Sequence, residues 1–280
     1  MGEVFERFIS ESPLTVMLRV LLEQSLPASE VDQLFEDYAQ RQYHRELLFS
    51  TIVNLMSLVV CGISASVNAA YQSKTKGIGV SIQSVYNKLN GLEPPIVEAL
   101  VRHGVSKAKP LIDELDGRLP ALLPDYQVKI LDGNHLAATE HRLEVLRDIG
   151  SGPLPGQALV ILDPTLMLAT DVFTCEDGHA QERSLLGRVL ATVNSNDLWI
   201  ADRNFCTLGF LFSIRARGGS FVIRQHGNLP WQPLSELVSQ GSNETGSVWE
   251  QSVQLTLNQT LTLTLRRVVI QLKQPTRDGV

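Results

Sequence analysis

The chain has 280 residues, enough to bury a sizeable core, and 44% of them are hydrophobic, which excludes an intrinsically disordered protein. Its formal net charge of −6 argues against a general nucleic-acid binder. Its three separate cysteines form no Cys-x-x-Cys pair, which disfavours a disulfide framework or a zinc site and fits a reducing cytosol. The N-terminus is charged and lacks the apolar segment of a signal peptide, so we expect a cytoplasmic protein.

The charge is unevenly spread along the chain. Residues 1–50 hold nine acids and four bases, whereas residues 71–109 hold six bases and two acids. This basic block is the best place in the sequence for phosphate contacts, and an ordinary solvated surface is the alternative interpretation. Its bases are Lys74, Lys76, Lys88, Arg102, Lys107 and Lys109.

The first part of the chain is predicted to be helical. Apolar residues recur at helical spacing over residues 14–22, and Pro27 ends that helix. We expect Ser29 to cap the next helix, with Asp32 supplying negative charge to its first turn.

An apolar helix is expected over residues 46–70. Polar residues interrupt its apolar run, which is shorter than the roughly 20 apolar residues that a membrane span needs, so a buried core helix is the better interpretation. A short helix with a polar face follows a glycine-containing turn, over residues 81–89, and another starts at Pro94 and runs to about Val105. The polar-faced helix has the features of a DNA-recognition helix, although an ordinary connecting helix explains it equally well.

From about residue 127 the pattern changes to strands that alternate with amphipathic helices. The order βββαβαβ predicts a mixed α/β sheet, in which three probable antiparallel strands are followed by strands parallel to the first. The expected strands are 128–132, 157–162, 166–174, 198–201 and 220–224, and the expected helices are 180–194 and 207–217.

Residues 228–274 are predicted to be rich in β-structure. Val253, Leu255 and Leu257 alternate with polar residues, Asn258-Gln259 forms a turn, and a second alternating run begins at Leu261. This pattern is typical of a β-hairpin.

Two aspartates end buried strands, Asp132 after 128–131 and Asp202 after 198–201. A carboxylate in this position is costly unless it has a partner, and two of them on neighbouring strands indicate a shared divalent metal ion. Asp163 also ends a strand, but Pro164 follows and a turn explains it. Asp171 is interpreted as an edge residue, and the acidic cluster at 176–179 as a turn and helix cap.

Two segments resemble the first and second catalytic motifs of a known family: LDGNHL at 131–136 and ADRNFC at 201–206. The family is that of the bacterial insertion-sequence DDE transposases, in the group of insertion sequence four. The order βββαβαβ around the two segments is also similar to that family. The closing PTRDG at 275–279 is also similar, and the likeness covers about residues 30–280.

The resemblance implies a ribonuclease H-like catalytic core over residues 126–227, an N-terminal helical DNA-binding or assembly region over 1–125, and a β-rich insertion over 228–280. It implies that Asp132 and Asp202 are catalytic ligands of Mg²⁺ or Mn²⁺.

The implied reaction is cleavage and strand transfer of double-stranded DNA at transposon ends, by a protein associated with the nucleoid. Arg203 and Asn204 are expected to contact DNA phosphate or to orient the metal ligands. His135 either does the same or makes a structural hydrogen bond. A second copy or a full-length transposase is the expected protein partner.

One part of the family pattern is missing. The family carries a third carboxylate in a Tyr-x-x-Arg-x-x-x-Glu helix after the insertion, whereas this chain has no tyrosine after Tyr126. Glu236, Glu244 and Glu250 lie in loop or strand contexts and do not fit that role. We therefore expect a C-terminally truncated transposase that is inactive alone. The alternative is a truncated DNA-binding protein that holds element ends or inhibits a full-length transposase.

Overall fold

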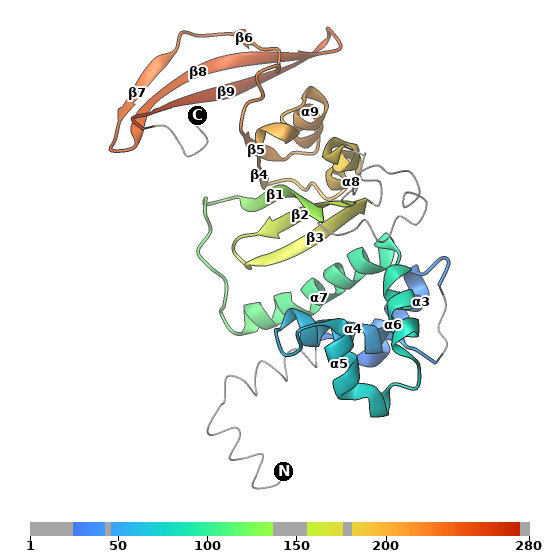
Figure 1. Cartoon of the computed structure of the whole chain (residues 1–280). Coiled ribbons are helices and arrows are strands. Elements are labelled where there is room, and N and C mark those ends of the chain that lie inside the picture. Colours follow the sequence, from blue (N-terminus) through green and yellow to red (C-terminus); the bar gives the residue numbers. More distant parts are fainter. Residues whose placement is uncertain (1–24, 43–45, 137–155, 176–180, 275–280) are drawn as a thin grey trace. The chain divides into compact units, whose positions relative to one another are not determined.

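The structure is a computed structural model, and it describes residues 25–42, 46–136, 156–175 and 181–274, apart from the side chains of Lys76, His135 and Leu136 (Figure 1). The predictions for the helix at 14–22, the acidic cluster at 176–179 and PTRDG lie outside the described residues, as do those for the side chains of Lys76 and His135. Contacts divide the chain into two compact units. Unit 1 comprises Met1–Leu122 and Asp132–Leu185, and unit 2 comprises Leu123–Leu131 and Leu186–Val280.

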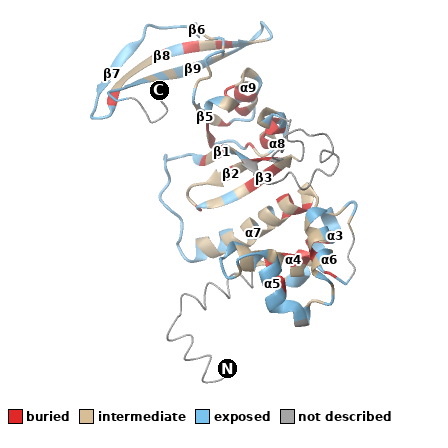
Figure 2. Ribbon diagram, in the orientation of Figure 1, coloured by how far each residue is buried: buried red, intermediate tan, exposed pale blue. Residues whose placement is uncertain are grey.

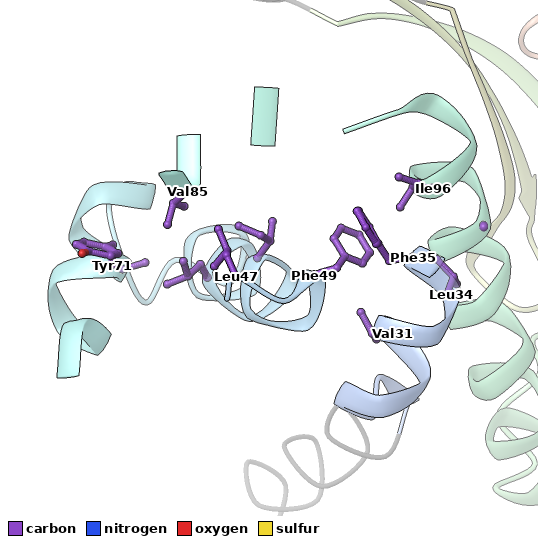
Figure 3. Packing of buried hydrophobic residues seen from close by; sticks show 12 residues of the cluster. Val31, Leu34, Phe35, Leu47, Phe49, Tyr71, Val85 and Ile96 are labelled. Carbon is purple, nitrogen blue, oxygen red and sulfur yellow. The ribbon is translucent and has the colours of Figure 1, made fainter. Parts of the chain in front are cut away.

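The helices of unit 1 surround an apolar core. Phe35 and Phe49 lie at its centre with ring centroids 5.2 Å apart, and Figure 3 shows Ile96 and Val31 around them. The helices are α3 (Ala28–Tyr38), α4 (Phe49–Val60), α5 (Val67–Lys74), α6 (Ile82–Asn90) and α7 (Pro94–Glu114), with a 3₁₀ turn η1 (Thr75–Gly77) between α5 and α6. The predicted helical character of this region is confirmed for the described residues.

The single apolar helix expected over residues 46–70 is wrong. α4 ends at Val60, and Gly62 adopts φ +71°, which a side chain rarely tolerates. The N–H of Ile63 then donates to the carbonyl of Leu58, the bond that closes a glycine-terminated helix. The Ser66 hydroxyl accepts from the Ala69 N–H and starts α5. Among the described residues, no helix is both long and apolar enough to cross a membrane.

The expected cap at Ser29 is also wrong, because α3 already begins at Ala28 after Pro27. Asp32 makes contacts beyond its own helix. Its carboxylate accepts from the backbone N–H and from the hydroxyl of Ser50, at 2.8 Å each, and so satisfies the first turn of α4. Side-chain capping thus holds two helices together.

Helix α7 runs beyond the predicted end near Val105 and contacts β3 within unit 1. The Glu98 side chain is buried, and one oxygen accepts from the Thr174 N–H at 2.9 Å and from its hydroxyl at 3.1 Å. Arg102 donates to Asp171 at 2.8 Å one helical turn further on. These polar contacts fix the helix against the strand, because a buried carboxylate needs such donors.

The first sheet is a mixed sheet with hydrogen-bonded order β3-β2-β1-β4-β5. β2 and β3 are antiparallel, whereas β4 is parallel to both β1 and β5. The strands are β1 (Gln127–Leu136), β2 (Gly156–Asp163), β3 (Leu168–Cys175), β4 (Asp197–Ala201) and β5 (Ser220–Ile223). The helix expected at 180–194 is shorter and consists of η4 (Glu182–Leu185) and α8 (Leu186–Leu190), while α9 spans Leu208–Ala216. The prediction of a mixed α/β fold is confirmed.

The second sheet belongs to unit 2 and confirms the predicted hairpin. β8 (Gly246–Leu257) pairs along its full length with β9 (Leu261–Leu272), and Asn258 and Gln259 both have positive φ, as a type I′ turn requires. Two short strands, β6 (Gln232–Pro233) and β7 (Val238–Ser242), complete this sheet. Figure 2 shows buried positions on β8, where Leu255 packs with Leu211 of α9, and none on β9.

The two contact units cut across the three domains predicted from the sequence. The helical region packs with β3 through α7, while α9 packs with the second sheet. The division into three domains at residues 125 and 227 stays a prediction.

Candidate metal centre

The parallel pair of β1 and β4 in unit 2 is held by a buried ion pair at one end. Lys129 donates to Asp197 Oδ2 at 2.9 Å, and the Asn194 N–H donates to the same oxygen at 2.7 Å. Asp197 is fully buried, and the Lys129 ammonium also lies 5.3 Å from the centre of the Trp199 ring. These bonds link the two strands near the start of their pairing, and removal of the cation would leave a buried charge uncompensated.

The register of this pair ends at Leu131 and Ala201, which are Cα partners. Asp132 follows Leu131 and Asp202 follows Ala201, so each aspartate comes one residue after the last paired couple. In parallel strands, partners in register direct their side chains to the same face. Asp202 directly follows β4, as predicted, whereas Asp132 lies inside β1, so the prediction that the first strand ends at Asp132 is wrong. Asp132 belongs to unit 1 and Asp202 to unit 2.

The carboxylates of Asp132 and Asp202, the two candidate metal ligands, are exposed, and each accepts a hydrogen bond from a nearby backbone N–H. Asp132 Oδ1 accepts from the Gly133 N–H at 2.9 Å, and Asp202 Oδ1 accepts from the Asn204 N–H at 2.8 Å, which starts the 3₁₀ turn η5 (Arg203–Phe205). Within the described residues, the Oδ2 atoms of both aspartates have no hydrogen-bond partner. Mg²⁺ and Mn²⁺ prefer such oxygens, so the donor type fits the implied metal.

Glu182 is an acid near Asp132 that sequence reasoning did not consider. Its carboxylate lies against Gly133 within unit 1, in the space that a Cβ of that residue would occupy. A side chain at position 133 would therefore displace the Glu182 carboxylate from its present position. Among the described residues, however, no group of three or more histidines, cysteines, aspartates or glutamates is arranged to hold a metal ion.

The other carboxylates have structural roles or lie elsewhere. Asp163 accepts from the backbone N–H groups of Thr165 and Leu166, which confirms the predicted turn. Asp171 is on β3, an edge strand as predicted, but it is nearly buried and pairs with Arg102. Glu236 and Glu244 are exposed in loops, and Glu250 lies on β8, 3.5 Å from Arg266; all three belong to unit 2.

Several basic side chains of the predicted DNA-binding block already bond to other residues of unit 1. Arg102 pairs with Asp171 and Glu98, and Lys107 pairs with Glu30 of α3 at 2.7 Å. Lys88 donates to the Leu47 carbonyl at 3.0 Å and lies 4.3 Å from the centre of the Phe35 ring. Burial lowers the pKa of Lys88, although the charge of Asp32 opposes that shift.

Lys74 and Lys109, in contrast, are exposed and make no ion pair within the described residues. Among the members of the block whose side chains the structure describes, these two are the best able to bind a phosphate. Arg203 is also exposed, directly after Asp202, whereas Asn204 is half-buried in η5.

A cavity of about 880 Å³ lies beside α6 in unit 1. Arg41 and Lys88 supply its cationic groups, and Ser84 and Asn87 come from α6 itself. Close by, the Glu93 carboxylate accepts the backbone N–H groups of residues 40–42 at 2.8–3.2 Å. No sequence pattern predicts this contact, because residues 40–42 and Glu93 are far apart along the chain.

A search of protein-family models and of curated proteins finds no match to the chain.

Proposed function

We propose that the chain is a DNA transposase of the DDE type, with Asp132 and Asp202 as ligands for divalent metal ions. The observation that carries the proposal is the β1/β4 register, in which Leu131 and Ala201 are partners and an aspartate follows each. Exposed carboxylates are the ligand type that phosphodiester chemistry with Mg²⁺ or Mn²⁺ uses, and one stands directly after the last paired residue of each strand.

The strand order gives further support. A mixed sheet ordered 3-2-1-4-5, with an antiparallel β2–β3 pair and parallel β1, β4 and β5, is compatible with the ribonuclease H-like fold that the resemblance implies. Metal bound there would activate a water or a DNA 3′-hydroxyl and stabilise the leaving oxygen. The exposed guanidinium of Arg203 is suited to hold a DNA phosphate next to this position.

A second candidate function is a DNA-binding protein that holds element ends or inhibits a full-length transposase. This function is favoured because no group of three acidic, histidine or cysteine side chains among the described residues is arranged to hold a metal ion. In this case DNA would bind without cleavage, and the partner in the cell would be a full-length transposase or a second copy in the nucleoid.

Duplexes that carry the DNA flanking the coding sequence separate these functions. We expect the full chain to retard them in a gel, and Mn²⁺ to support nicking only if a third carboxylate is present. Asp132→Asn and Asp202→Asn should each abolish any nicking and leave DNA retention intact. Asp163→Asn is the matched control, because this strand-end aspartate serves a turn.

If Glu182→Gln also abolishes nicking, Glu182 is identified as the third acid. Glu236, Glu244 and Glu250 would then not be needed in that role. DNA retention without nicking in every variant would establish the DNA-binding function. Nicking that survives both Asp132→Asn and Asp202→Asn, or no retention of DNA at all, would contradict the proposed transposase.

A further inference from the structure

Helix α6 presents two amide side chains on its exposed face. Val85 is fully buried and Ile82 and Leu89 pack on the core of unit 1, so the opposite face of this nine-residue helix is turned outward. Gln83 and Asn87 are exposed there, one helical turn apart. Figure 3 shows Val85 on the core side, together with Tyr71 of α5.

The two amides are joined to each other. Gln83 Nε2 donates to Asn87 Oδ1 at 3.0 Å. Within the described residues, Gln83 Oε1 and Asn87 Nδ2 have no further partner, so the pair offers one acceptor and one donor side by side. Reversing both amides exchanges the two roles and leaves the same combination.

One acceptor beside one donor matches a single base in duplex DNA. In the major groove, adenine presents the N7 acceptor next to the N6 amino donor, whereas guanine presents two acceptors. Cytosine offers only a donor and thymine only an acceptor and a methyl group. The amide pair of α6 is therefore complementary to adenine.

The surroundings of α6 fit a duplex. An α-helix with its side chains is about 10–12 Å wide, and the major groove is about 12 Å wide. The Tyr71 hydroxyl donates to the Val80 carbonyl at 2.8 Å, which ties α5 to the start of α6, and α5 ends at the exposed Lys74. Arg41 lines the same cavity as Asn87. Lys74 and Arg41 are both exposed and so available for DNA phosphates.

We propose that α6 enters the major groove of DNA and that Gln83 and Asn87 together read one adenine. The proposal rests on the proposed DNA-binding function and adds the element and the base that determine its sequence preference. Phosphate contacts position the protein, whereas this amide pair selects the sequence.

Selection from a randomised duplex library by the full chain provides the bound site. We expect an adenine whose replacement by 7-deazaadenine weakens binding by wild type about 5- to 150-fold. Asn87→Ala and Gln83→Ala should lower affinity for the selected site by a similar factor and lose sensitivity to 7-deazaadenine, with unchanged circular dichroism and thermal unfolding. Gln33→Ala is the matched control, since Gln33 makes an equivalent exposed pair with Asp37 on α3.

Failure of this inference differs from failure of the proposed function. Wild type that binds duplexes with salt-dependent affinity but selects no adenine would overturn the inference alone. So would an Asn87→Ala variant that remains sensitive to 7-deazaadenine, or a clear preference for duplex RNA. If wild type retains no DNA, both the inference and the proposed function fall.

Discussion

At the scale of single residues, Glu93 is an anchor of the helical unit. Burial raises its pKa, but the backbone N–H groups of residues 40–42 and the charge of Arg41 outweigh burial, so the pKa of Glu93 lies below its ordinary value of 4.5. A lowered carboxyl pKa means that the ionised form is stabilised in the folded state. This contribution is complete above the ordinary pKa and is lost as pH falls through the lowered value.

Glu93→Gln should therefore destabilise unit 1 at neutral pH, by about 1 kcal/mol because the site is largely solvated. Its unfolding free energy should also fall less steeply than that of wild type below about pH 4.5, because the titrating group is gone. Urea unfolding monitored at several pH values measures both effects. Glu114→Gln, an exposed acid at the end of α7, is the control, and an identical pH dependence of wild type and Glu93→Gln would contradict this account.

Lys129 and Asp197 form the second polar anchor, at the start of the β1/β4 pair. Lys129→Met leaves the fully buried Asp197 carboxylate without its cation, and we expect a loss of about 3–5 kcal/mol in unfolding free energy. Adding Asp197→Leu to this variant should restore part of the loss, because the uncompensated charge is removed. A single Lys129→Met variant as stable as wild type in chemical denaturation would show that the pair does not hold the strands.

At the scale of elements, local patterns predicted most of the secondary structure. The hairpin could be predicted from apolar residues such as Val253 and Leu255 that alternate with polar ones. The strand β4 could be predicted from the apolar run before Asp202. The break at Gly62 was missed because the apolar run continues through Cys61 and Ile63, and only the left-handed backbone at the glycine ends the helix.

Contacts between distant segments could not be read from the sequence. Glu98 with Thr174, Asp197 with Lys129, and Glu182 with Gly133 each depend on tertiary packing, and no spacing along the chain indicates them. The position of Asp202 after β4 could be predicted because a buried apolar run with a polar residue behind it has a clear local pattern. The same pattern placed the end of the first strand at Asp132, whereas β1 continues to Leu136.

Because Lys88 already bonds inside unit 1, the structure also predicts which basic side chains contact DNA phosphates. Lys74→Gln should reduce the slope of log affinity against log salt by about 0.9, as expected when one phosphate contact is lost. Lys88→Met should leave the slope unchanged, because its ammonium already bonds to the Leu47 carbonyl and lies over Phe35. Fluorescence anisotropy with a fixed duplex over a salt series measures both slopes. A larger change for Lys88→Met than for Lys74→Gln would show that α6 opens on binding.

At the scale of the whole molecule, the proposal is that Asp132 of β1 and Asp202, which follows β4, are both ligands of divalent metal ions. The α/β topology and the strand register are features of the described structure, while the metal and the DNA reaction are proposals built on them.

The most direct test of this claim is Mn²⁺ binding by the full chain, measured by electron paramagnetic resonance of the unbound ion. We predict saturable binding to wild type and at least about tenfold weaker binding to Asp132→Asn and to Asp202→Asn, with Asp163→Asn unchanged. Equal Mn²⁺ affinity in wild type and both aspartate variants would contradict the account, since the two residues would then not be ligands.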